Sequence, residues 1–561
     1  MFGLWECCAS SSENLYEEIL EEVPNPFSLP SPLPNWPKGN DFATGKICLG
    51  EIEVVKITKF EKIWSCIPSR GKAKGATFYK PLGIPNGYFN LGHYCQPNDR
   101  QLRGYVLVAK GVSADTPQNG QLSVLEKPLN YSLIWSSESG KNKCGYIWLP
   151  NPPVGYKPMG YVVTTEPNEP NLEEIRCVRS DLTESCEVSE VIFDSNTLST
   201  KDQVYVCDTR PCKRGMLCKG VPVGTFFCRR DESSEDELTI ACLKNLDSTH
   251  FAMPNLEQIH ALIKHYGPTL YFHPDEAYLP SSVSWFFENG ALLYKEGRDK
   301  GLTIDRKGSI LPDGGKNDGE FWLDLPEEDE NRDNVKCGDI ETAELYTHVK
   351  PASGGTFTDI SMWIFCPFNG PATIKVGVLS YTFNRIGQHV GDWEHYTLRI
   401  SNFDGELWSV YFSEHSGGEW LDASELEFIE GNKTIVYASK NGHASFPHEG
   451  CYIQGSTKLG IGAKNDCAKS DYYVDSSTKY QIVAAEYLEI IEPPWLQYMR
   501  EWGPTVVYDS LSELEKILKY LPFFVRSSVE DLIELFPDEV YGEEGPTGPK
   551  EKDNWIGDER C

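Results

Sequence analysis

The chain has 561 residues, of which 83 are acidic and 52 are basic, so its formal net charge is −31. This charge argues against nucleic acid as a partner and against simple electrostatic adhesion to anionic lipid. No apolar run is long enough for a membrane-spanning helix, and Met1–Ser12 lacks the features of a secretory signal, which predicts a cytosolic protein without a transmembrane span. Short alternating apolar runs between turn residues, with 12% aromatic residues, predict a mainly β protein.

Residues 1–44 predict an N-terminal strap that begins with a short acidic helix at Asn14–Val23 and continues as an extended, proline-rich segment. From residue 45 to residue 230 the sequence repeats itself. A Pro-x-Gly-Tyr turn and its variants recur at Gly87, Gly155 and Gly224, at intervals of 68 and 69 residues. Three similar units of short aromatic strands are best buried as three sheets around one axis, which predicts a threefold β-prism.

The repeat resembles the β-prism associated with multivesicular-body sorting proteins. The resemblance is carried by the pattern Trp-x-Pro, Pro-Pro-x-Gly-Tyr and Met-Gly, as at 148–160. It implies contact with membranes or partners through loops at one end of the prism.

A polar, charged stretch at 231–250 predicts an acidic linker, and residues 251–541 predict a β-sandwich with a few peripheral helices. Asn255 and Gln258 form a capping box for one helix, and Ser510 and Ser528 begin two more helices near the C-terminus. Residues 542–561 predict a polar tail. The expected sandwich strands are Thr342–Val349, Met362–Cys366, Ile374–Tyr381, Trp393–Ile400, Leu407–His415 and Thr434–Ala438.

Candidate ligands are concentrated in His389–His395, at the start of one of these strands. Asp392 and Glu394 are two residues apart, so both carboxylates are expected on one face of the strand. His389 lies in the preceding turn, close enough to join them. Two carboxylates and an imidazole at a strand end predict a metal-binding cluster.

A hairpin signal at Asp404-Gly405 follows this strand and sets an expected pairing register. If these two residues form a two-residue turn, Glu394 faces His415 on the returning strand. The predicted metal ligands are therefore His389, Asp392, Glu394 and His415.

A mixed oxygen and nitrogen set suits a divalent cation, with Ca²⁺ or Mg²⁺ favoured by the carboxylates and Zn²⁺ or Mn²⁺ as alternatives. A second interpretation is a hydrogen-bonded polar network without a metal. Additional site residues are expected in the loop 439–449 and near the start of the sandwich. They are His443, His448 and Asp275.

Several motifs together resemble a plant member of the vacuolar protein sorting-associated protein 62 family. They are Tyr271–Leu279, His389–His395, Lys440–Pro447 and the Pro-Trp-Leu and Trp-Gly-Pro segments at 494–504. The family name implies a trafficking role.

The segment 388–394 is also similar to the Gly-His-Arg-His-Asp-Trp-Glu heptapeptide of the necrosis- and ethylene-inducing peptide-like cytolysins. That resemblance implies a β-sandwich with a divalent cation used at membranes, with His389, Asp392 and Glu394 at ligand positions. Gln388, Val390 and Gly391 depart from the heptapeptide.

No nucleotide-binding loop, serine elbow or zinc-protease helix is present, so binding is favoured over catalysis. The leading hypothesis is a non-enzymatic protein that binds membrane lipid, a glycolipid head group or a trafficking protein, peripherally on endosomal or vacuolar membranes. The alternatives are a pore-forming, toxin- or defence-like protein and a metal-dependent hydrolase.

Overall fold

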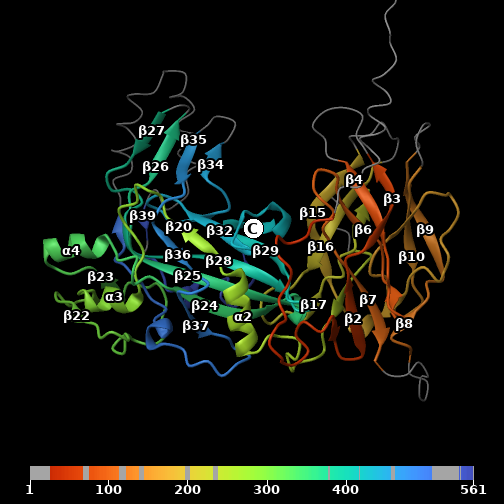
Figure 1. Ribbon diagram of the computed structural model, residues 1–561, viewed down its shortest axis with the longest axis horizontal. Coiled ribbons are helices and arrows are strands. Elements are labelled where there is room, and N and C mark those ends of the chain that lie inside the picture. Colours follow the sequence, from red (N-terminus) through yellow and green to blue (C-terminus); the bar gives the residue numbers. More distant parts are fainter. Residues whose placement is uncertain are drawn as a thin grey trace, which may run out of the picture.

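The computed structural model has the mainly β class that the sequence predicts, with strands arranged in several mostly antiparallel sheets (Figure 1). Among the residues it describes, no helix is long and apolar enough to cross a membrane. The helices predicted at Asn14–Val23 and after Ser510 and Ser528 lie outside the described residues. The described residues are 26–66, 75–112, 122–137, 144–195, 203–230, 238–376, 379–415, 417–456, 461–507, 542–543 and 545–559.

Residues 46–244, called the repeat region below, consist of short antiparallel strands at one end of the molecule (Figure 1). β19 lies within the stretch predicted as a linker, and it pairs with β14 and β17. The strands are β1 Lys46–Cys48, β2 Ile52–Ile57, β3 Phe60–Cys66, β4 Ala76–Pro81, β5 Phe89–Asn90, β6 Tyr94–Pro97, β7 Val106–Gly111, β8 Leu125–Glu126, β9 Asn130–Ser136, β10 Tyr146–Asn151, β11 Tyr156–Lys157, β12 Val162–Thr164, β13 Cys177–Arg179, β14 Thr183–Glu184, β15 Cys186–Asp194, β16 Tyr205–Pro211, β17 Gly220–Val221, β18 Phe227–Arg229 and β19 Cys242–Lys244.

Aromatic side chains from all three repeats pack into one core. The rings of Trp64 and Trp135, at equivalent positions of the first two repeats, are 5.9 Å apart. Phe226 of the third repeat stands 5.3 Å from Phe78 and 5.8 Å from Tyr161. These residues are buried in a single cluster, so the repeats fold by burying their aromatic faces against one another.

Residues 256–559, called the C-terminal region below, contain longer strands and the described helices. The helices are α2 Leu256–Tyr266, α3 Val283–Glu288 and α4 Asp329–Lys336. The strands are β20 Thr269–Tyr271, β21 Leu292–Lys295, β22 Leu302–Thr303, β23 Phe321–Asp324, β24 Leu345–Ala352, β25 Phe357–Asn369, β26 Thr373–Val376, β27 Leu379–Thr382, β28 His389–Ser401, β29 Leu407–Glu414, β30 Gly417–Asp422, β31 Phe428–Ile429, β32 Lys433–Ala438, β33 Ser445–Phe446, β34 Gly450–Ser456, β35 Ile461–Cys467, β36 Tyr473–Asp475, β37 Tyr480–Ala484, β38 Val506–Val507 and β39 Gly542–Glu543.

The centre of this region is a long sheet in the order β30-β29-β28-β25-β24-β37. One face packs on α2 and on a shorter sheet, β31-β32-β20-β36, through a core that includes Tyr266, Met362 and Tyr396. The other face is covered by α3 and by residues near 495–502 and 555. β25 is buried along its whole length, because both faces of the sheet are covered.

Local sequence signals located several elements well. The Asn255–Gln258 capping box forms as predicted at the start of α2, and the expected strands at 393–400 and 434–438 lie within β28 and β32. The single strand expected at Ile374–Tyr381 is wrong, since this stretch forms the hairpin β26–β27.

The predicted register of the β28–β29 hairpin is wrong by one residue. The Ser401 amide donates a 2.9 Å hydrogen bond to the Glu406 carbonyl oxygen, so residues 401 and 406 are paired and the turn between them spans four residues rather than two. An extra residue on β29, Trp408, then shifts the pairing, and Tyr396 faces Phe412. By this register the residue opposite Glu394 is Glu414, not His415.

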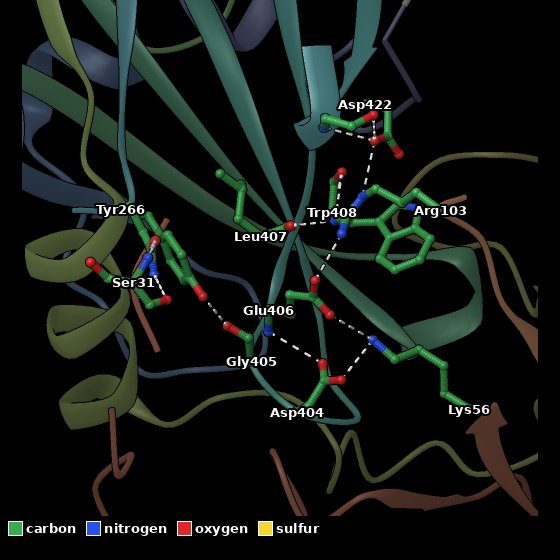
Figure 2. A network of polar contacts seen from close by, with 12 residues as sticks. Ser31, Lys56, Arg103, Tyr266, Asp404, Gly405, Glu406, Leu407, Trp408 and Asp422 are labelled. Carbon is green, nitrogen blue, oxygen red and sulfur yellow. Dashed lines mark hydrogen bonds and ion pairs between the residues drawn. The ribbon is translucent and has the colours of Figure 1, made fainter. Parts of the chain in front are cut away.

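Ion pairs join the two regions at the tip of this hairpin (Figure 2). Lys56 of β2 lies 2.7 Å from Asp404, and Arg103 lies 2.8 Å from Glu406 and 2.9 Å from Asp422. The side chains of Lys56 and Arg103 are only 3% and 4% exposed. Two buried cations of the repeat region therefore hold the tip of the β28–β29 hairpin, and they fix the position of the long sheet relative to the repeat region.

Candidate metal centre

The four predicted ligands line one cavity at the beginning of β28. Its volume is about 430 Å³, and its wall includes His389, Asp392, Glu394 and His415. It is called the strand-end cavity below. Loops 370–373 and 440–442, strand β35 and residues 545–547 complete the wall. The structure thus brings the predicted set together even though the predicted hairpin pairing is wrong.

Gly391 explains how His389 reaches the same cavity as Asp392. In a regular strand, residues three apart point to opposite faces. Gly391 has φ +70°, in the left-handed region, and this interrupts the alternation. As a result Val390 and Trp393 both belong to the core on one face of the long sheet, whereas His389 and Asp392 both line the cavity.

Replacing Gly391 with alanine is expected to destabilise the protein by about 2–4 kcal/mol and to weaken cation binding, because of left-handed strain and overpacking. An added Cβ would lie 2.6 Å from the Trp502 carbonyl oxygen. Urea unfolding measures the first effect and metal titration the second. The control is Gly417→Ala in β30, where an added Cβ meets nothing within 4 Å. Equal stability of the two variants would contradict the role given to Gly391.

The four side chains carry donors of the type that divalent cations take, but among the described residues no three of their ligand atoms lie within 4.8 Å of one another. His389 Nδ1 lies 2.8 Å from the Gly391 carbonyl oxygen, so a neutral ring carries its proton on Nδ1 and its lone pair on Nε2. His415 Nε2 lies 3.1 Å from Asn465 Oδ1, a contact that orients its ring. With Asp392 and Glu394, these rings offer two carboxylates and two imidazoles, the donors that divalent metals take in proteins.

Behind the cavity, Asp392 belongs to a buried charge network. His443 Nδ1 lies 2.7 Å from Asp392 Oδ2, and His443 Nε2 lies 3.8 Å from Glu276 Oε2. Burial would raise the pKa of the Asp392 carboxyl, but the hydrogen bond from His443 and the charges of His443, His389 and His415 together outweigh burial, and the pKa is lowered. Burial would lower the pKa of the His443 imidazole, but Cys366, Asp392 and Glu276 together raise it well above its usual value. His443 is therefore a buried imidazolium between two carboxylates.

Cys366, Asp392 and His443 also offer three ligand atoms within 4.8 Å of one another. Two ligands of one tetrahedral zinc ion are about 3.3 Å apart, whereas His443 and Asp392 are at the hydrogen-bond distance of 2.7 Å. Burial raises the pKa of the Cys366 thiol to about 11, so it stays protonated. This trio is a hydrogen-bonded support for Asp392 rather than a second metal centre.

The other expected site residues lie away from the cavity wall. His448 is exposed, and Asp275 is exposed with Lys440 Nζ 3.7 Å away. Sequence reasoning missed Glu276, which is buried and accepts hydrogen bonds from the amides of residues 277, 278 and 441. No local signal separates Glu276 from Asp275, because the two acidic residues are adjacent in one turn and only the fold decides which of them is buried.

Residues 545–559, called the C-terminal segment below, also contribute to the cavity through Gly545, Pro546, Thr547 and Lys552. The segment is fixed by Glu559, whose Oε2 lies 3.0 Å from His395 Nε2 and whose Oε1 accepts a 2.6 Å hydrogen bond from Thr397. Trp555 stacks on His348 with ring centroids 4.0 Å apart. The sequence pattern predicted a polar tail here, but Trp555 and Glu559 are buried.

Residues 23–559 match the family model described as vacuolar protein sorting-associated protein 62. No curated protein matches the chain. Among solved structures, GNIP1Aa from Chromobacterium piscinae is 19% identical, with 37% of this chain and 40% of that chain covered and a TM-score of 0.28. This chain thus spans well under half of that protein's length.

Two further structures are similar over part of the chain. NLPPya in complex with glucosamine is 13% identical, with 40% of this chain and 71% of that chain covered and a TM-score of 0.20. The necrosis- and ethylene-inducing protein 2 from the causal agent of cocoa's witches' broom disease is 18% identical, with 32% and 76% covered and a TM-score of 0.17.

Proposed function

The chain belongs to the vacuolar protein sorting-associated protein 62 family, and from this premise we propose that it is a non-enzymatic binding protein whose strand-end cavity holds a divalent cation. The observation that carries the proposal is the convergence of His389, Asp392, Glu394 and His415 on one cavity. Ca²⁺ or Mg²⁺ is proposed, with Mn²⁺ and Zn²⁺ as alternatives. The ligand proposed for the bound cation is the head group of a membrane glycolipid.

The cavity is suited to a hydroxyl-rich group. Its volume of about 430 Å³ lies in the range of small-molecule sites and is large enough for a sugar ring. A cation at the two carboxylates would bind vicinal hydroxyls, and Lys440, Lys464 and Lys552 on the wall would donate hydrogen bonds to the remaining oxygens. The protein would then associate peripherally with a membrane.

We also infer that the repeat region is a β-prism that precedes a β-sandwich. The inference is supported by close contacts among residues of the three repeats. A Cβ on Gly92 would lie 2.8 Å from Thr225 and 3.0 Å from the Cα of Gly160. The three repeats therefore approach one another closely, as sheets around a common axis do.

Purified protein is expected to contain a divalent cation by elemental analysis and to bind glycolipid vesicles only when that cation is present. Glu394→Gln should weaken cation binding more than about 100-fold, since losing a ligand costs at least as much as losing a residue that supports one. His448→Gln is the matched control, because His448 is exposed on a neighbouring loop. Full metal content in Glu394→Gln would refute the ligand assignment.

Vesicle experiments separate the proposed function from its alternatives. Binding without leakage supports a peripheral receptor for glycolipid. Cation-dependent release of a trapped dye would favour a pore-forming protein, and metal-dependent cleavage of phosphoesters or esters that Glu394→Gln abolishes would favour a hydrolase. Metal binding without vesicle binding would refute the glycolipid proposal and keep the metal centre.

A further inference from the structure

A second and larger cavity lies between the repeat region and the C-terminal region. Its volume is about 690 Å³, and it is called the junction cavity below. Its wall in the repeat region carries Arg100, Asp208, Lys213 and Arg214, and its other wall includes Arg399 and the C-terminal segment. It shares none of the proposed metal ligands.

Several cations of this cavity are already used by the fold. Arg103 is held by Glu406 and Asp422 and donates to the Leu407 carbonyl oxygen, as Figure 2 shows. Arg399 makes two hydrogen bonds to Asp359, of 2.8 and 2.7 Å. Arg103 and Arg399 hold the two walls in place. Their charges are already paired with carboxylates of the protein, so we do not assign them to a ligand.

Three other cations on the repeat-region wall are not neutralised in this way. Among the described residues, Arg100 and Lys213 have no carboxylate within ion-pair distance, and Arg214 has only Asp558, at 3.5 Å. The Nε of Arg100 is buried and has no hydrogen-bond partner among the described residues. A buried donor left unpaired costs about 1–3 kcal/mol. Burial would lower the pKa of Arg100, but Tyr94, Asp422 and Glu425 raise it, so Arg100 keeps its charge. Lys213 and Arg214 are exposed, and together the three cations offer a positive wall to an anionic ligand.

Asp208 lies on the same wall and adds a negative charge to it. Its carboxylate accepts a hydrogen bond from the Thr209 amide, and no cation of the described chain lies within ion-pair distance of it. The Asp208 side chain is open to the cavity, but the protein around it limits its hydration and raises its pKa to about 6. Glu190 on β15 adds to this, whereas Arg100 and Arg210 lower it. Asp208 is therefore a negative charge that a bound anion would meet at neutral pH and would no longer meet in acid.

We propose that the junction cavity is a binding site for a small anion carrying more than one phosphate group, held by Arg100, Lys213 and Arg214. Guanidinium and ammonium groups are the side chains that bind phosphate oxygens most strongly. The cavity volume of about 690 Å³ accommodates a ring or chain with several phosphates. The same chemistry occurs in free polyphosphates and in the head groups of phosphorylated lipids.

Calorimetric titration with inositol hexakisphosphate and with pyrophosphate tests the site directly. Arg100→Gln and Lys213→Gln are each expected to weaken binding about tenfold, because each removes a charge-assisted hydrogen bond. The control is Lys62→Gln, an exposed lysine of β3 outside the cavity, which should bind like the wild type. Absence of binding by the wild type, or equal losses in all three variants, would overturn the proposal. Metal content measured on the same samples shows whether the strand-end cavity is intact.

Asp208→Asn provides a variant with increased binding that misfolding would not produce. It should bind inositol hexakisphosphate more tightly than the wild type at pH 7.5, because the repelling charge is gone. Wild-type binding should strengthen as the pH falls through about 6, where Asp208 gains its proton, and this increase should be smaller in Asp208→Asn. Weaker binding by Asp208→Asn at pH 7.5 would overturn the assignment of the wall.

A second arm distinguishes the two sources of phosphate. Phosphatidylcholine vesicles with and without phosphatidylinositol bisphosphate are sedimented with the protein. If the site takes free polyphosphate, inositol hexakisphosphate binds in solution and the vesicles do not. If it takes a lipid head group, the vesicles bind and Arg100→Gln releases them. Failure of both arms would overturn the proposal.

Discussion

Replacing His443 with leucine is expected to lower the free energy of unfolding by about 3–5 kcal/mol, the usual cost of leaving a buried charge without its partner. His443 is 1% exposed and lies between Asp392 and Glu276. Leucine fills the volume but leaves two carboxylates buried near each other with no cation between them. The variant should also lose affinity for the metal, because Asp392 loses the hydrogen bond that orients it.

Urea unfolding with a chelator present measures the stability of His443→Leu without a contribution from bound metal. His448→Leu is the matched control, since the same substitution at an exposed histidine should change stability by no more than about 0.5 kcal/mol. A loss below about 1 kcal/mol in His443→Leu would mean that the charges at Asp392 and Glu276 are compensated by water or by protonation.

Replacing Glu559 with alanine is the second large effect and should also cost about 3–5 kcal/mol. The Glu559 carboxylate is bonded to His395, Thr397 and Asn554 inside the protein. Loss of these bonds should free the C-terminal segment, which limited proteolysis between residues 545 and 559 would detect. Glu551→Ala in the same segment is the control, because Glu551 takes no part in the hydrogen bonds of Glu559 with His395, Thr397 and Asn554. Wild-type protease resistance in Glu559→Ala would contradict the role of the pair.

The cost of Glu559→Ala should depend on pH in a defined direction. Burial would raise the pKa of Glu559, but the His395 charge and hydrogen bond outweigh it and lower the pKa from 4.5 to about 2. A carboxyl with a lowered pKa stabilises the fold fully above pH 4.5 and loses this contribution as the pH falls toward 2, an effect of about 3 kcal/mol. The stability difference between wild type and variant should therefore narrow below pH 4.5. A stability difference that stays constant below pH 4.5 would contradict the lowered pKa of Glu559.

Sequence reasoning located the fold class and the main strands because these depend on local patterns. The repeat and the α2 capping box are examples, and the family that the motifs indicated is confirmed over residues 23–559. The hairpin register was wrong because it depends on two features that Asp404-Gly405 does not reveal. These are a four-residue turn and the extra residue Trp408 on β29.

In the candidate site, too, sequence reasoning predicted the features that have a local signal and missed those that depend on the fold. His389, Asp392 and Glu394 were predicted because ligand-type residues cluster in the sequence. His415 was predicted from a hairpin pairing that is wrong, yet it lines the same cavity as the other three residues. Glu276 was missed in favour of its neighbour Asp275, since a one-residue difference decides which side chain is buried and sequence alone does not fix it. The C-terminal segment was missed because contacts across more than 150 residues, such as Glu559 with His395, have no local signal.

The position of the C-terminal segment also has a consequence for the synthesis of the protein. Its residues line the strand-end cavity through Thr547 and Lys552 and the junction cavity through Gly557 and Asp558. The ribosome makes these residues after every other residue of either wall. A nascent chain that has not yet received this segment therefore lacks part of the wall of both cavities, and neither proposed site can be complete before residues 545–559 are made.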